Sequence, residues 1–281
     1  MRTTLEASPR SSGAAATIGF PPALLANLRR FLATSQAVLS VGGPPRSGLA
    51  QASARLRVQL AAELSPQARM VLSLHIPKTA GLTFSRLLAE IFGEDFYRSY
   101  WEISDCRGRA VADFPENARC IHGHFCPDLL LARYPSALLL TWVRDPVQRV
   151  ASLYHYWQRE PDWRHPLCRT LHAGRLSLLE FARQDAARNE MSRFFGRLQP
   201  EDFSFIGIFE ELPASLELFF RRFDLAPRPV SHGHRNPERS TGRYAIPADE
   251  RAEIAALNSA DGALYRECVA QFQRAHAAQA A

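Results

Sequence analysis

Short, continuous apolar runs separated by amphipathic segments are the dominant pattern from about residue 65 onward. Met70–His75, Ala137–Val143 and Asp202–Phe209 have the length and composition of buried parallel strands. Apolar residues recur at helical spacing in the segments that follow these runs: Leu82–Phe92, Val147–Trp157 and Glu210–Phe223. Helical patterns also cover Ser177–Arg183, Ala186–Phe195, Ala248–Leu257 and Asp261–Arg274. This alternation predicts an α/β fold with a central parallel sheet covered by helices.

The first 64 residues have a different composition, rich in Ala, Ser, Gly and Pro. Pro21–Pro22 and Gly42–Pro45 lie on either side of a helix predicted from Ala23 to about Ser40. We therefore predict an N-terminal extension over residues 1–64 and one domain over residues 65–281. Apolar residues are too sparse in Ser11–Leu28 for a membrane span, and a signal peptide is a less favoured alternative. We expect a cytoplasmic protein without membrane insertion.

Lys78 is the only lysine of the chain, in which arginine supplies every other permanent side-chain cation. It lies in Ile76–Gly81, a turn of mostly small residues between a predicted strand and a predicted helix. A turn in that place directs backbone N–H groups and the positive end of the helix dipole at one point, which favours an anion. The compact lysine ammonium can reach a single oxygen in such a loop. The pattern predicts an anion site, and a solvated lysine retained by chance is the alternative.

The loop is not a Walker A sequence, because its lysine precedes the only glycine. The segment His-Ile-Pro-Lys-Thr-Ala-Gly-Leu-Thr, which begins at His75, resembles the 5′-phosphosulfate loop of sulfotransferases that use 3′-phosphoadenylyl sulfate (PAPS). Within that superfamily it is most similar to the carbohydrate branch with heparan sulfate and uronyl 2-O-sulfotransferases. The resemblance implies a three-layer, P-loop-like sulfotransferase fold. It also implies that the donor is held by six residues: Lys78, Thr79, Ala80, Gly81, Leu82 and Thr83.

Two loop positions depart from the family pattern. Thr or Ser is usual where this chain has Leu82, and a second glycine is common where it has Ala80. Leu82 removes one hydroxyl contact, so a non-catalytic nucleotide- or glycan-binding relative of the sulfotransferases is an alternative. A P-loop-type kinase is a further alternative, although no clear Mg²⁺-binding acidic strand end accompanies the loop.

A second motif follows the next predicted strand. Arg144-Asp-Pro146 begins a predicted helix with its proline near the first turn, and taken alone it is a common turn. With Ser152 eight residues after Arg144, it resembles the 3′-phosphate-binding element of the same family. The resemblance implies that Arg144 and Ser152 bind the 3′-phosphate, and the planar fork of arginine suits two phosphate oxygens.

Two histidines lie between these motifs. His122 and His124 are two residues apart, and on an extended segment this spacing turns both to one face. A similar His-Gly-His segment supplies the catalytic base in the 2-O-sulfotransferase-like proteins, which implies that His124 is the base and His122 its neighbour. Such a pair is also half of a metal site, but no further ligands have a recognisable spacing, so we expect no metal. Ordinary structural histidines are the other alternative.

Two polar segments are candidates for the remainder of the site. Ser231–Arg243 is basic, and a late loop closes over the nucleotide in similar enzymes, which makes Arg239 and Ser240, with Arg235, candidates for donor binding. The other segment, Arg159–Arg175, contains Trp163 and is a candidate acceptor rim. A solvated surface loop is an equal alternative for both.

The net charge of +6 and the pI of about 9.4 favour an anionic partner. Nucleic acid is not expected, because no nucleic-acid-binding motif is present and the aromatic residues fall in apolar runs. Five cysteines without a CxxC pair argue against a disulfide scaffold or a zinc module and fit a reducing compartment.

The resemblance therefore implies an enzyme that moves a sulfuryl group in line from PAPS to a hydroxyl of a glycan or glycolipid acceptor. Adenosine 3′,5′-bisphosphate would be the second product. Lys78 and His124 would carry the chemistry, with His122 as neighbour. No motif indicates the oligomeric state.

Overall fold

In a computed structural model of the chain, the residues that can be described are 69–100, 115, 117–125, 127–230 and 243–280. They all belong to one unit, Arg57–Ala281, which is described by itself. The predicted extension over residues 1–64 lies outside the described residues, and so do Arg235, Arg239 and Ser240. What the sequence indicates for these residues stays a prediction.

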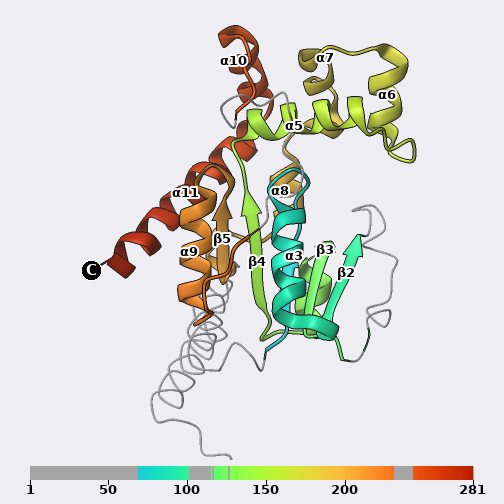
Figure 1. Ribbon diagram of the computed structural model, residues 1–281. Coiled ribbons are helices and arrows are strands. Elements are labelled where there is room, and N and C mark those ends of the chain that lie inside the picture. The colour runs from blue at the N-terminus through green and yellow to red at the C-terminus, as the bar shows by residue number, and fades with distance from the viewer. Residues whose placement is uncertain (1–68, 101–114, 116, 126, 231–242, 281) are drawn as a thin grey trace, which may run out of the picture. The chain divides into compact units, whose positions relative to one another are not determined.

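Five parallel strands form a single sheet in the order β2-β3-β1-β4-β5 (Figure 1). Their bounds are β1 Val71–Leu74, β2 Phe96–Tyr100, β3 Cys120–His124, β4 Leu138–Val143 and β5 Phe205–Ile208. Every residue of β1, β4 and β5 is buried, as expected for strands covered on both faces. The predicted parallel α/β sheet is confirmed.

Nine α-helices occur in the described part of the chain. They are α3 Gly81–Phe92, α4 Pro127–Arg133, α5 Pro146–Arg159, α6 Pro166–Gly174, α7 Leu178–Ala182, α8 Glu190–Phe195, α9 Leu212–Arg222, α10 Ala248–Leu257 and α11 Ser259–Ala280. Short 3-10 turns occupy Gly93–Asp95, Asp185–Ala187, Pro200–Asp202 and Phe209–Glu211. The segment Arg159–Arg175, expected to be a loop, contains α6. Its helix starts with His165 as the N-cap and Pro166 in the first turn.

Helices cover both faces of the sheet. The chain crosses from β1 through α3 to β2 at one edge, and later crosses back from β3 through α4 to β4. These crossovers run in opposite directions, so right-handed connections place α3 and α4 on opposite faces. Helix α9 shares the face of α3, because the ring of Phe84 in α3 meets that of Phe219 in α9 edge-on, with centroids 5.1 Å apart.

A second apolar cluster lies among α5, α6, α7 and α10. Val150, Leu153 and Trp157 of α5 pack there with Leu171 and Phe181. Figure 1 shows α5, α6 and α7 beyond the arrowheads of the strands, at the carboxyl edge of the sheet. Because the cluster anchors one face of α5, the helix is held in a fixed position above that edge.

Candidate active site

The carboxyl ends of β1 and β4 are neighbours in the sheet, and the chain leaves them in opposite directions, toward β2 and toward β5. Ligands of open parallel α/β sheets bind at such a switch point. Both predicted phosphate-binding segments lie there, the loop 75–80 after β1 and Arg144 after β4. Arg144 Nη1 donates a hydrogen bond of 3.1 Å to the carbonyl oxygen of Lys78. The tertiary structure therefore brings the two motifs into direct contact.

The loop after β1 has a backbone geometry that suits an anion. Lys78 and Ala80 are left-handed, with φ of 69° and 89°, and Thr79 between them is not. Such alternation directs successive N–H groups to one side and forms an anion-binding concavity. The Thr79 hydroxyl donates a 2.8 Å hydrogen bond to the carbonyl of Ile76, which closes the turn. Left-handed residues other than glycine are strained and cluster at ligand sites, so this loop has the character of one.

Helix α3 begins at Gly81 directly after the loop. No side chain caps its N-terminus, and no acidic residue lies in its first turn. Its first N–H groups and the positive end of its dipole therefore suit an anion bound from outside the helix. Thr83 in this turn is buried.

Leu82, in the first turn of α3, does not belong to the buried face of the helix. Its side chain is 50% exposed, whereas Leu87 and Leu88 are buried. The reason is helical geometry, because Phe84, Leu87 and Leu88 define the buried face and Leu82 lies off it. Leu82 therefore points to solvent.

Three histidine rings gather at the carboxyl ends of β1 and β3. Leu74 pairs with Gly123 in the sheet, which places His75 level with His124. The ring centroid of His75 lies 5.2 Å from that of His122 and 4.9 Å from that of His124. His75 was not among the candidate catalytic residues predicted from the sequence. The rule that neighbouring parallel strands end at one edge could have found it, given the strand order.

Two further side chains define this histidine cluster. Ser73 Oγ and His122 Nδ1 share a hydrogen bond of 2.9 Å inside the sheet. Tyr100, at the end of β2, stands edge-on to His124 with centroids 5.1 Å apart, and 46% of its side chain is exposed. His122 is almost completely buried, whereas His124 is only partly covered. His124 is therefore the more exposed of the two predicted histidines, although its Nε2 atom is buried.

Burial sets the protonation of the cluster. It lowers the pKa of His122 to about 3 and that of His124 to about 4. The pKa of His75 is also lowered, by burial first and then by the charges of His122, His124 and Lys78. A charged imidazole is disfavoured in such a setting. The rings are therefore neutral at pH 7, and His124 is in the form that accepts a proton.

The segment after β4 is ordered by its own contacts. The Asp145 side chain accepts a 2.9 Å hydrogen bond from the backbone N–H of Gln148 and so caps α5, with Pro146 in the first turn. Arg144 is only 2% exposed, and its guanidinium lies 4.2 Å from the ring centroid of Phe209, with Nε 3.9 Å from a carboxylate oxygen of Glu210. Arg144 thus joins β4, the lysine loop and the end of β5. Its contact with a 3′-phosphate stays a prediction, as does that of Ser152, which is also buried.

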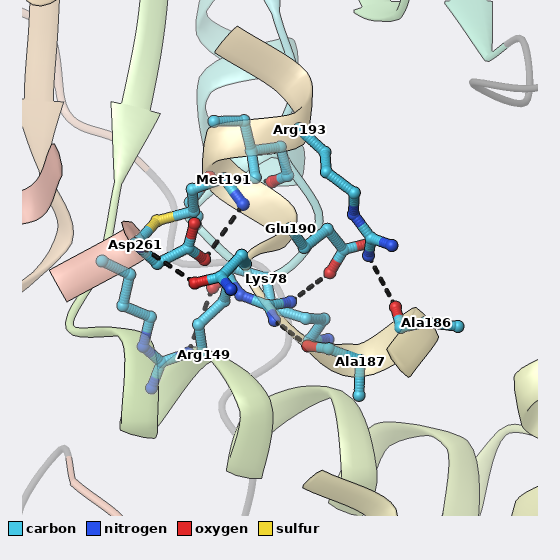
Figure 2. A network of polar contacts seen from close by, with 12 residues as sticks. Lys78, Arg149, Ala186, Ala187, Glu190, Met191, Arg193 and Asp261 are labelled. Carbon is cyan, nitrogen blue, oxygen red and sulfur yellow. Dashed lines mark hydrogen bonds and ion pairs between the residues drawn. The ribbon is translucent and has the colours of Figure 1, made fainter. Parts of the chain in front are cut away.

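Arg149, which lies in α5 between Arg144 and Ser152, has a structural role. It is completely buried, and its guanidinium forms an ion pair with Glu190 and donates a 3.0 Å hydrogen bond to the carbonyl of Ala187. Figure 2 shows this network, in which Asp261 of α11 also accepts a 3.1 Å hydrogen bond from the N–H of Met191. Arg149 therefore ties α5 to α8.

The chain returns to α5 at Tyr244, just after the predicted closing loop. The Tyr244 N–H donates to Gln148 Oε1 at 2.7 Å, and Gln148 Nε2 donates to the Tyr244 carbonyl at 3.1 Å. The Tyr244 ring stacks on His155, with centroids 4.8 Å apart and an interplanar angle of 10°. This double hydrogen bond fixes Tyr244 beside the first turns of α5. Neither Gln148 nor Tyr244 was a predicted site residue.

The predicted acceptor rim contains an exposed tryptophan. Trp163 is 59% exposed, and its carbonyl accepts a 2.8 Å hydrogen bond from Arg169 of α6, which also donates to the carbonyl of Arg164. The segment before α6 is thus held by backbone contacts while the indole faces solvent. Its role in acceptor binding stays a prediction.

Neither a metal site nor a membrane-spanning helix occurs among the described residues. No group of three or more His, Cys, Asp or Glu side chains in those ranges is arranged to hold a metal ion. None of the helices described is both long and apolar enough to cross a membrane. Cys120, Cys168 and Cys268 are buried and are not in disulfides.

Comparisons with known proteins give two levels of result. No protein-family model matches the chain, and no curated protein matches it by sequence. Among solved structures, the chain is similar to a sulfotransferase from Alicyclobacillus acidocaldarius, with 16% identity, a TM-score of 0.40, and coverage of 73% of this chain and 99% of that one. It is also similar to the mouse sulfotransferase SULT7A1 complexed with PAP, with 12% identity, a TM-score of 0.34, and coverage of 73% and 68%.

Proposed function

We propose that this protein is a sulfotransferase that moves a sulfuryl group from PAPS to a hydroxyl of a carbohydrate-type acceptor. The observation that carries the proposal is the contact between the two motifs that resemble donor-binding elements. The Arg144 guanidinium donates to the carbonyl oxygen of Lys78 across a sequence separation of 66 residues. The contact places both motifs at the switch point of the sheet, where ligands of open parallel α/β sheets bind.

The residues at this switch point suit a donor that carries phosphate groups at both the 3′ and the 5′ positions of its nucleoside. The alternating backbone at Lys78–Ala80 and the uncapped start of α3 suit the 5′-phosphosulfate. Ser152 in α5 and Arg144 before it would hold the 3′-phosphate. Arg239 and Ser240 would contact the nucleotide from the closing loop.

PAPS supplies an activated sulfuryl group whose sulfur is attacked by the acceptor oxygen. A new S–O bond to the acceptor forms as the S–O bond to the 5′-phosphate breaks, and the electron pair stays on the phosphate oxygen. Lys78 would stabilise the charge that develops there, together with the loop N–H groups. His124 would remove the acceptor proton as general base, aided by its neutral state. The products are a sulfate ester and adenosine 3′,5′-bisphosphate.

The acceptor side of the site would be lined by Tyr100. Its half-exposed ring stands beside His124, so an acceptor hydroxyl that reaches the base passes this ring. An aromatic face beside a polar group is a common wall for a sugar ring, whose C–H face packs on it. This arrangement supports a glycan, glycolipid or glycoside acceptor.

Thermal stabilisation by nucleotides tests the donor site first. We expect adenosine 3′,5′-bisphosphate to raise the melting temperature, and ATP, AMP and adenosine 5′-phosphosulfate to raise it less. Ser152→Ala should remove the advantage of the bisphosphate over AMP. Ser152 is a better test than Arg144, whose removal would also release the lysine loop. Thr170→Ala, which removes an exposed hydroxyl on α6, is the matched control.

Transfer of labelled sulfate from PAPS to a panel of glycans and glycosides then tests the reaction. Product in the parent and none in His124→Ala is the expected result. Selective bisphosphate binding without transfer to any acceptor would favour a non-catalytic relative. Equal or stronger stabilisation by ATP with Mg²⁺ would favour a phosphotransferase and overturn the proposal.

A further inference from the structure

The side chain of Lys78 rests on an aromatic ring of α5. Its Nζ atom lies 3.8 Å from the centroid of the Tyr156 ring, which is close enough for attraction between a cation and the ring face. Burial, followed by the charge of Glu160, raises the pKa of the Tyr156 phenol. The ring is therefore neutral at pH 7, and it attracts the ammonium without neutralising it.

Both ends of Lys78 are held by the same part of the fold. Its carbonyl oxygen accepts the hydrogen bond of Arg144, which precedes α5 by two residues, and its ammonium lies on Tyr156 within that helix. The left-handed backbone of Lys78 lies between these two contacts. Two interactions of different kinds thus fix the residue against one element.

Tyr156 follows Ser152 by four residues in α5, so the two side chains lie one turn apart on the same side of the helix. We propose that Tyr156 is a positioning residue for Lys78. Its ring holds the ammonium beside the bridging oxygen of the donor, on the helix face where Ser152 holds the 3′-phosphate. The catalytic part of this inference rests on the proposed function, whereas the contact of Lys78 with Tyr156 does not.

A ring serves this purpose better than a carboxylate would. A carboxylate would cancel the charge of Lys78 and compete with the donor oxygen, whereas a ring lets the ammonium move to that oxygen as negative charge develops. Loss of the ring should therefore slow transfer more than it weakens binding of adenosine 3′,5′-bisphosphate, which carries no sulfuryl group.

The contact can be measured without any enzymatic assay, because Lys78 is the only lysine of the chain. Reductive methylation with ¹³C-formaldehyde labels this side chain, and its NMR signal is separate from that of the α-amino group. We expect the ring of Tyr156 to shift the signal upfield in the parent protein. The Tyr156→Phe variant, which keeps an aromatic ring, should retain this shift. In Tyr156→Leu the signal should move to the position of free dimethyl-lysine.

Tyr134→Leu is the matched control. Tyr134 is also half-buried and has a cation, Arg133, 5.6 Å from its ring, but it precedes β4 at the amino edge of the sheet. This variant should leave the Lys78 signal unchanged. An unshifted signal in the parent, or one that Tyr156→Leu does not alter, would overturn the inference.

Kinetics provide the second readout, with the acceptor found in the sulfate-transfer panel. Tyr156→Leu should lower kcat by at least about tenfold and change the Kd of adenosine 3′,5′-bisphosphate less than about threefold, whereas Tyr156→Phe should stay within about twofold of the parent in both. Equal losses in Tyr156→Phe and Tyr156→Leu would show that the ring face is not what matters. If the parent binds no bisphosphate, the proposed function fails, and the NMR shift still decides whether Tyr156 holds Lys78.

Discussion

The ring of His75 occupies the space in which a side chain on Gly81 would lie. A Cβ atom on Gly81 would be 1.8 Å from both Cδ2 and Nε2 of His75. His75 ends the β1 segment and Gly81 begins α3, so the loop between them folds the imidazole onto the start of the helix. Glycine is thus required here by close packing and not by a left-handed backbone. The histidine cluster and the candidate donor loop are parts of one packed unit.

Gly81→Ala should displace His75 and disturb both parts of this unit. Overpacking of this kind costs about 1–3 kcal/mol of unfolding free energy, which urea unfolding would measure, and bisphosphate binding should weaken as well. Gly262→Ala in α11 is the control, because the nearest atom would be Arg266 Nη1 at an ordinary 3.6 Å. Unchanged stability and binding in Gly81→Ala would show that the His75 ring is not held there.

His124→Ala should abolish sulfate transfer while leaving nucleotide binding nearly intact. General base catalysis is worth about 10²–10⁴ in rate, and His124 touches neither Lys78 nor Arg144 through any contact described above. Measured kcat and the Kd of the bisphosphate would separate the two effects. His276→Asn, on the distant end of α11, should change neither quantity. Loss of bisphosphate binding in His124→Ala would instead assign the ring a structural role.

Acid should destabilise the protein well before its carboxylates are protonated. The pKa values of His122 and His124 are lowered from 6.5 to about 3 and about 4. Between pH 6.5 and the lowered pKa values, the unfolded chain binds protons that the folded chain does not. The stability that the two neutral histidines contribute is therefore fully present above pH 6.5 and is lost as the pH falls toward 4. We expect the free energy of unfolding to fall by at least about 1 kcal/mol between pH 7 and pH 4.5.

Urea unfolding at both pH values checks this, and His122→Asn should reduce the difference. The acid limb of kcat/KM should likewise lie well below pH 6.5, because His124 stays neutral there. A limb centred near pH 6.5 would mean that His124 is solvated and not buried as in this structure.

Arg149→Met should destabilise the fold without specifically affecting the donor site. The substitution leaves Glu190, which is 14% exposed, without its ion-pair partner, and breaking a buried pair from one side costs about 3–5 kcal/mol. Thermal or urea unfolding would show the loss, and Arg149→Met with Glu190→Met should recover part of it. Arg197→Met removes an exposed pair with Asp128 and should cost less than about 0.5 kcal/mol. A stable single variant would contradict the network of Figure 2.

Local sequence patterns predicted the elements that carry the site, with small errors in the bounds of each element. The run Met70–His75 became β1, Ala137–Val143 became β4, and the helix expected over Leu82–Phe92 is α3. These segments are strongly apolar and bounded by glycine or proline, so their conformation depends little on the rest of the chain.

Two of the elements that were missed, β2 and α6, lack such a signal. Strand β2, Phe96–Tyr100, is an edge strand with mixed burial and follows a 3-10 turn directly, so no long apolar run marks it. Helix α6 presents only three buried residues among polar neighbours. In both cases the pairing with a distant segment, and not the local pattern, stabilises the element.

Taken alone, the sequence determined the strand–loop–helix order around Lys78, the helix start at Pro146 and the shared face of His122 and His124. These follow from local rules of backbone and side-chain geometry. The order of the strands decided which of these segments meet. It placed the ring of His75 beside that of His124, let Arg144 donate a hydrogen bond to the Lys78 carbonyl, and brought the Lys78 ammonium onto the Tyr156 ring. Such contacts join residues 49 to 78 positions apart, and no local pattern records which segments of a chain will become neighbours in a sheet.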